Sequence, residues 1–249
     1  MRAVALVDLD DTLFQTIGKC PPDIPREALT PIGFAKDGSA LSFATPRQMR
    51  FIAWLAETTH LVPVTARGLD ALRRVHIPFA AAVCAHGGVI LDEAGESDHE
   101  WRAHVTRQAT GHAHELAALA AAVIRSAGAV GARLSVRVLE EDSVGLYVLV
   151  KHPEADTAVL NAAVDGMTGD VPENWTIHRN GNNVALMPPY LGKQHAVARL
   201  LPGLRARFPD APVVGIGDSL TDAPFMALCD FAMMPPRSQL AGAIFDQER

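Results

Sequence analysis

Three short apolar runs, each followed at once by polar residues, constrain the fold of this chain more than any other feature. The runs are Ala3–Val7, residues 61–64 and residues 212–216, and they precede an aspartate, a threonine and a glycine–aspartate pair. Short apolar runs of this kind are typical of strands that are buried on both faces of a parallel sheet. The polar residues that follow them would then gather at one edge of that sheet.

Helical patterns lie beside these runs, at residues 46–57, 69–75, 193–208 and 221–228. Thr45 and Gln48 match a capping box, and Pro46 stands at the favoured first helical position. Strands that alternate with helices predict an α/β fold, a doubly wound, Rossmann-like parallel sheet covered on both faces. Such sheets bind ligands beyond the carboxyl ends of their strands.

The middle of the chain has a different pattern, which predicts an antiparallel sheet backed by helices. We expect helices at residues 100–126 and 156–167, and strands at 134–139, 144–150, 175–178 and 184–187. Asn180 and Gly181 predict a type I′ turn between the last two strands. Residues 92–188 are therefore predicted to be an inserted α+β domain, within a core made of residues 1–91 and 189–249.

Residues 18–44 fit neither pattern. They contain four prolines and a possible turn at residues 36–39. This segment is either a flap hairpin near the end of the first strand or a surface excursion without a role, and the sequence leaves both open.

Composition narrows the functional classes. A net charge of −6 without any Lys/Arg-rich block disfavours a nucleic-acid binder, which needs a basic face.

The apolar runs are too short to span a bilayer, and the N-terminal segment does not match a signal peptide, so the cytoplasm is the expected compartment. Three widely spaced cysteines indicate neither a disulfide framework nor a zinc site. His112 and His114 would point to different faces of a helix, which disfavours a histidine-bound metal.

Asp8 and Asp10 follow the first predicted strand. Phosphoryl transfer through a covalent intermediate needs a nucleophile, an acid/base group and a cation that screens the phosphate charge. Two carboxylates this close repel each other unless a metal ion or a shared proton relieves them. Mg²⁺, which prefers oxygen ligands, suits this pair. The alternative is a pair of solvated aspartates at a strand end.

Four further residues can contribute to such a site. Thr65 offers a hydroxyl and a backbone N–H to a phosphoryl oxygen, and Lys193 offers a compact positive charge. Asp218 can ligate a metal, with Asp222 orienting water molecules or the lysine. Each has an ordinary alternative, because threonine and aspartate also cap helices and an early lysine is usually solvated.

The joint order of these residues resembles the haloacid dehalogenase (HAD) superfamily of phosphohydrolases. Its pattern is Asp-x-Asp-x-Thr, then a Ser/Thr after a second strand, then a Lys, then Gly-Asp-x-x-x-Asp. This chain supplies, in that order, Asp8, Asp10, Thr12, Thr65, Lys193, Asp218 and Asp222. The insertion between Thr65 and Lys193 is similar to the large α/β cap of Cof-type phosphatases, sucrose-phosphatases, mannosyl-3-phosphoglycerate phosphatases and phosphomannomutases.

Three residues depart from that pattern. Asp11 replaces a frequent glycine, His86 stands in a segment where many relatives carry Asn-Gly, and Thr221 stands where they often carry asparagine. None of these changes removes an expected catalytic group.

The resemblance implies a role for each residue of the pattern. Asp8 would attack phosphorus to form an aspartyl phosphate, and Asp10 would protonate the leaving alcohol and then activate water. Thr65 and Lys193 would hold the phosphoryl group. Mg²⁺ would be bound by Asp8, the Asp10 carbonyl and Asp218, with support from Asp222.

The cap carries no diagnostic motif. A cluster of polar residues at its second hairpin can read sugar hydroxyls or can simply form the turn: Arg179, Asn180, Asn182 and Asn183. Thr12 and Arg67 are further candidates for substrate contact, although a surface arginine is the simpler interpretation.

We therefore expect a Mg²⁺-dependent phosphatase acting on a small phosphorylated metabolite, a sugar or polyol phosphate. Two rivals remain: a phosphomutase that returns the phosphoryl group to its substrate, and a non-catalytic metabolite-binding protein. The sequence does not indicate an oligomeric state.

Overall fold

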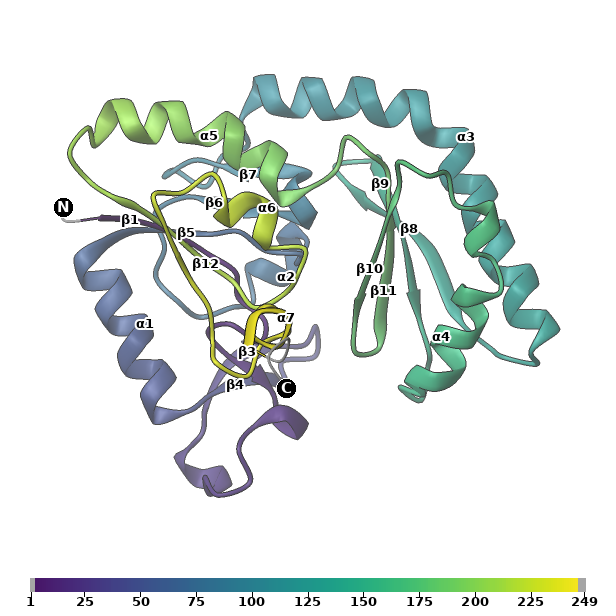
Figure 1. Cartoon of the computed structure of the whole chain (residues 1–249), viewed down its shortest axis with the longest axis horizontal. Coiled ribbons are helices and arrows are strands. Elements are labelled where there is room, and N and C mark those ends of the chain that lie inside the picture. Colours follow the sequence, from purple (N-terminus) through teal and green to yellow (C-terminus); the bar gives the residue numbers. More distant parts are fainter. Residues whose placement is uncertain (1–2, 246–249) are drawn as a thin grey trace. The chain divides into compact units, whose positions relative to one another are not determined.

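The computed structural model describes residues 3–245 and divides the chain into two units (Figure 1). The core unit runs to Trp101 and resumes at Lys193, and the cap unit is Arg102–Gly192. The limits expected from the sequence were residues 92 and 188. The first limit falls later because helix α3 (His99–Ala129) begins in the core unit.

The core unit contains a parallel sheet of four strands. Their order is β13 (Phe231–Met233), β12 (Val213–Ile216), β1 (Ala3–Val7) and β5 (Thr59–Pro63). The three predicted buried strands are therefore confirmed, and β1 lies between the other two. Their carboxyl ends meet at one edge of the sheet.

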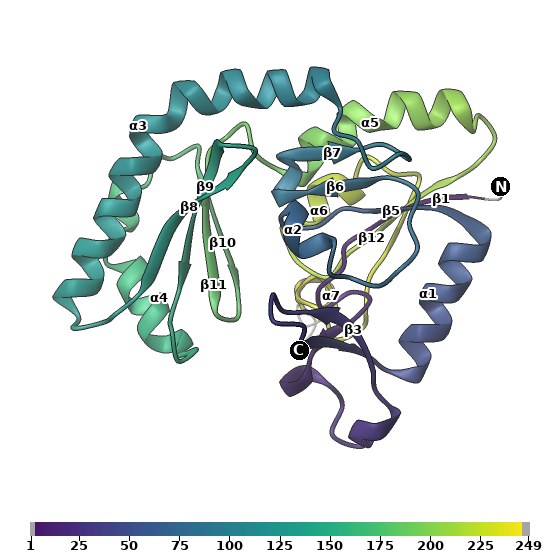
Figure 2. The ribbon, with the colours of Figure 1, turned by 180° about the vertical axis from the view of Figure 1, so that it is seen from behind.

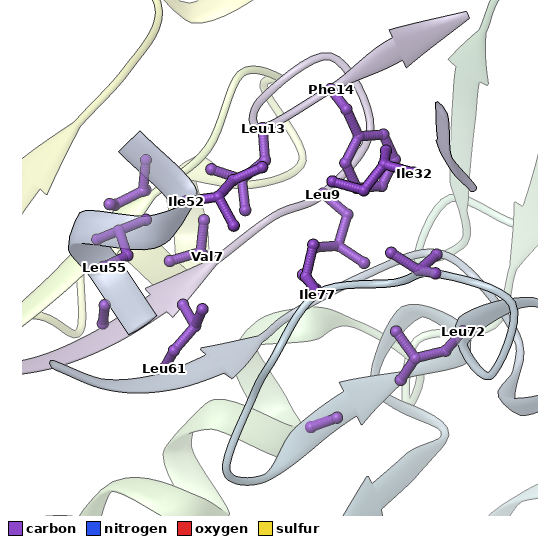
Figure 3. Packing of buried hydrophobic residues seen from close by; sticks show 14 of the residues in the cluster. Val7, Leu9, Leu13, Phe14, Ile32, Ile52, Leu55, Leu61, Leu72 and Ile77 are labelled. Atoms are coloured by element: carbon purple, nitrogen blue, oxygen red, sulfur yellow. The ribbon is translucent and has the colours of Figure 1, made fainter. Parts of the chain in front are cut away.

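Helices cover both faces of this sheet, as the sequence predicts (Figure 1). Helix α1 packs on one face, where Ile52 and Leu55 join the cluster that includes Val7 (Figure 3). Helix α6 packs on the other face, so closely that a Cβ on Gly215 would lie 2.9 Å from the Met226 Cα. The helices of the core unit are α1 (Pro46–Thr58), α2 (Leu69–Leu72), α5 (Lys193–Arg207), α6 (Ala223–Met226) and α7 (Gln239–Phe245), with 3-10 turns at Ile17–Lys19, Arg26–Ala28 and Ala85–Gly87.

The predicted capping box of α1 is confirmed. The Thr45 side chain accepts from the Gln48 backbone N–H, and the Gln48 side chain accepts from the Thr45 backbone N–H. Both bonds satisfy donors that a helix start otherwise leaves unpaired.

The proline-rich segment is a flap that belongs to the hydrophobic core. Strands β3 (Thr30–Phe34) and β4 (Ala40–Ala44) form an antiparallel hairpin, and β2 (Gln15–Thr16) pairs with the other edge of β4. Ile32 is 1% exposed and packs with Leu9 and Phe14 (Figure 3). Burying one such side chain contributes about 1.5–3 kcal/mol. The expected flap hairpin is therefore confirmed, and its buried residues belong to the core, whereas residues 36–41 at its tip are exposed. A second, shorter hairpin joins β6 (Ala82–Cys84) and β7 (Val89–Leu91).

The cap unit is an antiparallel sheet with helices on one face, as predicted. The strand order is β10 (Thr176–Asn180), β11 (Asn183–Met187), β9 (Val144–Lys151) and β8 (Ser135–Glu141). Helices α3 and α4 (Thr157–Asp165) cover one face (Figure 2), and a 3-10 turn follows at Thr168–Asp170. Among residues 3–245, no helix has both the length and the apolar character that crossing a bilayer requires.

The predicted type I′ turn is wrong in its register. The two residues between β10 and β11 are Gly181 and Asn182, and of these only Gly181 has a positive φ, 52°. A type I′ turn needs positive φ at both central residues. That condition is met instead between β8 and β9, where Asp142 and Ser143 have φ values of 48° and 66°.

Candidate active site

Asp8 lies at the carboxyl end of β1, at the edge of the sheet where the strand ends meet. Its backbone N–H donates to the Ile216 carbonyl at 2.8 Å, and the residue is only 5% exposed. The Lys193 Nζ donates to its Oδ1 at 2.6 Å, and the Thr12 Oγ1 lies 3.1 Å from its Oδ2. The structure thus brings the candidate nucleophile and the predicted lysine together across 185 positions of sequence.

Lys193 is also bound to Asp222, which fixes the lysine between two carboxylates. Its Nζ donates to the Asp222 Oδ1 at 2.6 Å. The Asp222 Oδ2 accepts from the backbone N–H groups of Asp218 and Ser219 at 3.2 and 2.9 Å, and from the Ser219 hydroxyl at 2.7 Å. Both oxygens of Asp222 are engaged in hydrogen bonds, so this residue holds Lys193 and the backbone of the Asp218 loop in place.

The loop from Gly217 to Asp222 needs a glycine at position 217, because a side chain there would collide with Asp222. A Cβ at that position would lie 2.5 Å from the Asp222 Cβ, a distance that real contacts do not reach. The glycine before Asp218 therefore lets the start of the following helix close over the strand end.

Asp218 lies beside Asp8 and completes an acidic cluster with Asp222. Ligand oxygens of the three residues all lie within 4.8 Å of one another. The Thr12 Oγ1 is 3.2 Å from the Asp218 Oδ1, so the same hydroxyl lies within reach of Asp8 and Asp218. Thr12 thus contacts the acidic cluster from within the loop that follows β1.

Burial and mutual repulsion dominate the electrostatics of this cluster. Burial raises the pKa of Asp8 well above its ordinary value, repulsion by Asp222 and Asp218 adds to this, and Lys193 opposes it. Burial, together with repulsion by Asp222 and Asp11, raises the pKa of Asp218 to about 6. Burial acts to raise the pKa of Asp222 too, but Lys193 more than offsets it and the pKa is lowered.

The same residues fit a bound Mg²⁺. They offer hard carboxylate oxygens, which this ion prefers. Lys193 supplies one positive charge against three carboxylates, and burial, with repulsion between the carboxylates adding to it, raises the pKa of Asp8 and Asp218. A divalent cation at this position would remove that repulsion.

The carboxylate of Asp10 does not join the cluster but is bound by Arg67. The Arg67 Nε and Nη2 each donate to a different Asp10 oxygen, both at 2.7 Å. Burial acts to lower the pKa of Arg67, but the bonds and charge of Asp10 more than offset it, so the pKa is raised. The sequence pointed to a substrate contact or a surface arginine and missed this pair. A usable signal was that both residues follow strands ending at the same sheet edge.

Thr65 is fully buried, and its two candidate hydrogen-bonding groups differ in availability. Its own backbone N–H already donates to the Val83 carbonyl at 2.9 Å, so this group of Thr65 is engaged within the core. The hydroxyl oxygen accepts from the Arg67 backbone N–H at 3.1 Å, which leaves the hydroxyl proton as the group that can donate.

Two departures from the family pattern fall at strained positions of the backbone. Asp11, in place of glycine, has a φ of 64°, and His86 has a φ of 55°. Asparagine, aspartate and histidine tolerate this left-handed region better than most residues. The Asp11 side chain binds Lys19 at 2.5 Å, which links the loop after β1 to the flap.

In the cap unit, the polar residues singled out are bound to their own surroundings. Arg179 donates to Asn161 and Asp165, both at 2.6 Å. Asn182 makes two hydrogen bonds with the backbone of His152, at 2.9 and 2.7 Å. Asn180 and Asn183 pair with each other at the end of the hairpin, as register partners.

A parallel α/β core, an inserted α+β unit and acidic residues at the strand ends together define a class of fold, that of the phosphatases which the sequence resembles. Among solved structures, the chain is similar to the C-terminal domain of C. albicans trehalose-6-phosphate phosphatase (TM-score 0.53, 14% identity, covering 90% of this chain and 72% of that one). It is also similar to the sucrose-phosphatase of Synechocystis sp. PCC6803 (TM-score 0.53, 16% identity, covering 99% and 88%).

No family model matches the chain, and no curated protein matches it in sequence. The similarity to solved structures therefore establishes the fold. It confirms the expected fold, a parallel α/β core with a large inserted α+β unit.

Proposed function

We propose that this chain is a Mg²⁺-dependent phosphatase that hydrolyses a small phosphate monoester through an aspartyl-phosphate intermediate on Asp8. The observation that carries the proposal is the buried lysine, whose Nζ lies 2.6 Å from both Asp8 and Asp222, beside the carboxylate of Asp218. A buried charge set of this kind costs folding free energy, which makes it a candidate functional site.

In the first half of the reaction, a carboxylate oxygen of Asp8 attacks phosphorus. The bond from phosphorus to the ester oxygen breaks, and the leaving alkoxide takes a proton from Asp10, so an alcohol departs. Lys193 stabilises the charge of the transferring group, and the Thr65 hydroxyl donates to one of its oxygens.

In the second half, a water molecule attacks the phosphorus of the intermediate. Asp10 accepts a proton from that water, the bond between phosphorus and the Asp8 oxygen breaks, and phosphate leaves. Both aspartates return to their starting states.

Mg²⁺ would be held by Asp8, the Asp10 carbonyl and Asp218. When bound, it supplies positive charge that screens the phosphate from the carboxylates. Asp222 supports this set through Lys193 and the backbone of Asp218.

A sugar or polyol phosphate is the proposed substrate class. The support is that the two similar structures with TM-scores of 0.53 are named for trehalose-6-phosphate and for sucrose. We place the protein in the cytoplasm, where such metabolites occur.

The test is a screen of phosphorylated sugars and polyols with Mg²⁺, scored both by phosphate release and by isomeric sugar phosphate. Release of phosphate supports the proposal. Isomerised product without phosphate release would point to the phosphomutase alternative. Metabolite binding without any turnover would point to the non-catalytic alternative. Asp8→Asn is the matched control, and turnover retained in that variant would contradict the assigned nucleophile.

A further inference from the structure

One residue of the flap reaches the Asp10–Arg67 pair. The Ser42 Oγ, on strand β4, accepts a hydrogen bond from the Arg67 Nη2 at 2.9 Å. That Nη2 is the same nitrogen that donates to the Asp10 Oδ1 at 2.7 Å. A chain of contacts therefore runs from the flap, through one guanidinium group, to the proposed acid/base carboxylate.

Ser42 is flanked by a paired strand on each side. It lies on the middle strand of the flap sheet, with register partners Thr16 on one side and Gly33 on the other, and it is 2% exposed. A side chain fixed by two neighbouring strands can in turn fix the group that it binds.

Gly33 leaves the space that this arrangement needs. A Cβ at position 33 would lie 3.0 Å from the Ser42 Cβ, 3.1 Å from the Ser42 Oγ and 3.5 Å from the Arg67 Nη1. Gly18, elsewhere in the same segment, has no atom within 4 Å of such a Cβ. Position 33 is therefore sterically tied to the Ser42–Arg67 contact, whereas position 18 is not.

The other surroundings of Arg67 also limit its freedom. Its guanidinium carbon lies 5.3 Å from the centre of the Phe14 ring, and Phe14 packs against Ile32 of the flap (Figure 3). A planar guanidinium that is bound along two edges and packed on a ring keeps one orientation.

We infer that the β3–β4 hairpin positions the carboxylate of Asp10 for proton transfer, through Ser42 and Arg67. This inference rests on the proposed function, because it concerns the proton that Asp10 gives to the leaving alcohol. Ser42 is a positioning residue, which acts on Asp10 through its hydrogen bond with Arg67. Without its hydroxyl, one N–H of the partly buried Arg67 loses its acceptor, so Asp10 and the Phe14 ring alone hold the guanidinium, which can then shift out of its two-pronged contact.

The test uses two esters whose leaving groups differ in their need for a proton. A 4-nitrophenolate leaves without protonation, whereas the alkoxide of a sugar or polyol phosphate needs it. Ser42→Ala is expected to lower kcat for the alkyl phosphate about tenfold, a small part of the roughly 100-fold to 10,000-fold that general acid–base catalysis contributes. Turnover of 4-nitrophenyl phosphate should change by less than about twofold, because it bypasses that step.

Gly33→Ala should produce the same selective loss by displacing Ser42, and Gly18→Ala is the matched control with unchanged rates for both esters. A Ser42→Ala loss that is equal for the two esters, or no loss, would overturn the inference while leaving the proposed function intact. Wild-type protein that releases phosphate from neither ester would overturn the proposed function.

A crystal structure of Ser42→Ala separates the structural part of the inference from catalysis. Arg67 should lose its two-pronged contact with Asp10 in that variant. An Arg67–Asp10 pair that is unchanged without the serine hydroxyl would overturn the inference whatever the activity.

Discussion

In the core unit, the polar side chains at the strand ends are bound to one another across long stretches of sequence, whereas in the cap unit they are bound to their own hairpin and helix. Lys193 joins Asp8 and Asp222 in a buried cluster, and Arg67 joins Asp10 to the flap. Asn182 instead binds the backbone of a neighbouring strand end.

This difference separates two uses of polar residues. Buried charges that are paired only with one another cost folding free energy and are kept where chemistry needs them. Partly exposed side chains that hydrogen-bond within their own hairpin stabilise the local fold at little cost. The comparison therefore supports the core unit as the place of the proposed chemistry, and the following changes test it in order of expected effect.

The largest effect is expected from replacing the buried lysine. Lys193→Met leaves Asp8 and Asp222 without a positive partner, which should destabilise the fold by about 3–5 kcal/mol. Loss of its charge at the phosphoryl group should lower kcat by about 100-fold to 1,000-fold. Urea unfolding and phosphate release measure the two effects. The control is His195→Met on the same helix, where the side chain is exposed; equal losses in both variants would contradict the assigned role.

A smaller effect is expected at Arg67. Arg67→Lys keeps the positive charge but cannot bind both oxygens of Asp10, so kcat for an alkyl phosphate should fall about tenfold to 100-fold. Arg73→Lys, at an exposed position, is the control. Full activity in Arg67→Lys would show that the two-pronged contact has no part in proton transfer.

Mg²⁺ should stabilise the protein against heat in a pH-dependent manner. The raised pKa of Asp218, about 6, means that the folded protein binds this proton more tightly than the unfolded chain does. Above about pH 6 the ionised carboxylate therefore costs stability, and a cation removes that cost. Below it, protons compete with the cation. We expect a higher Tm with Mg²⁺ at pH 7.5 and a smaller shift at pH 5.

Asp218→Asn is the control for this effect, because it removes a proposed ligand. It should abolish the Mg²⁺-dependent rise in Tm at pH 7.5. A rise that is equal at the two pH values, or that survives in Asp218→Asn, would place the cation elsewhere.

The smallest effects on catalysis are expected in the cap hairpin. Asn182→Ala removes two hydrogen bonds to the His152 backbone and should cost about 1–2 kcal/mol of stability. Arg179→Ala breaks a partly exposed ion pair and should cost less than about 1 kcal/mol. Turnover of 4-nitrophenyl phosphate should stay the same in both variants. A large loss of kcat without loss of stability would contradict the comparison, because it would show that a cap residue contributes to catalysis.

The sequence predicts the parts of this molecule that depend on local pattern and chain order. The buried strands and the α+β insertion follow from the pattern of apolar residues, and the capping box of α1 follows from the spacing of Thr45 and Gln48; all are found. Asp218 could be placed near Asp8 because parallel strands bring their carboxyl ends to one edge. Lys193, which begins helix α5, was placed there only through the resemblance in motif order.

The contacts of Arg67 could not be predicted in this way. Its pairing with Asp10 spans 57 positions and depends on how two loops fold, and the contact with Ser42 depends on the flap. Ser42 lies inside a strand and belongs to no recognisable sequence motif. The prediction of a type I′ turn at Asn180 and Gly181 is wrong for a related reason. Moving a turn by one residue changes the sequence pattern little, but it changes which residues adopt positive φ.

The central claim is that Asp8 carries the phosphoryl group between substrate and water. Rapid acid quenching during turnover, followed by peptide mapping, measures this directly. The account predicts a phosphorylated peptide that contains Asp8, and neither that peptide nor phosphate release in Asp8→Asn. Continued phosphate release by a folded Asp8→Asn protein, or a phosphoryl group on any other residue, would contradict it.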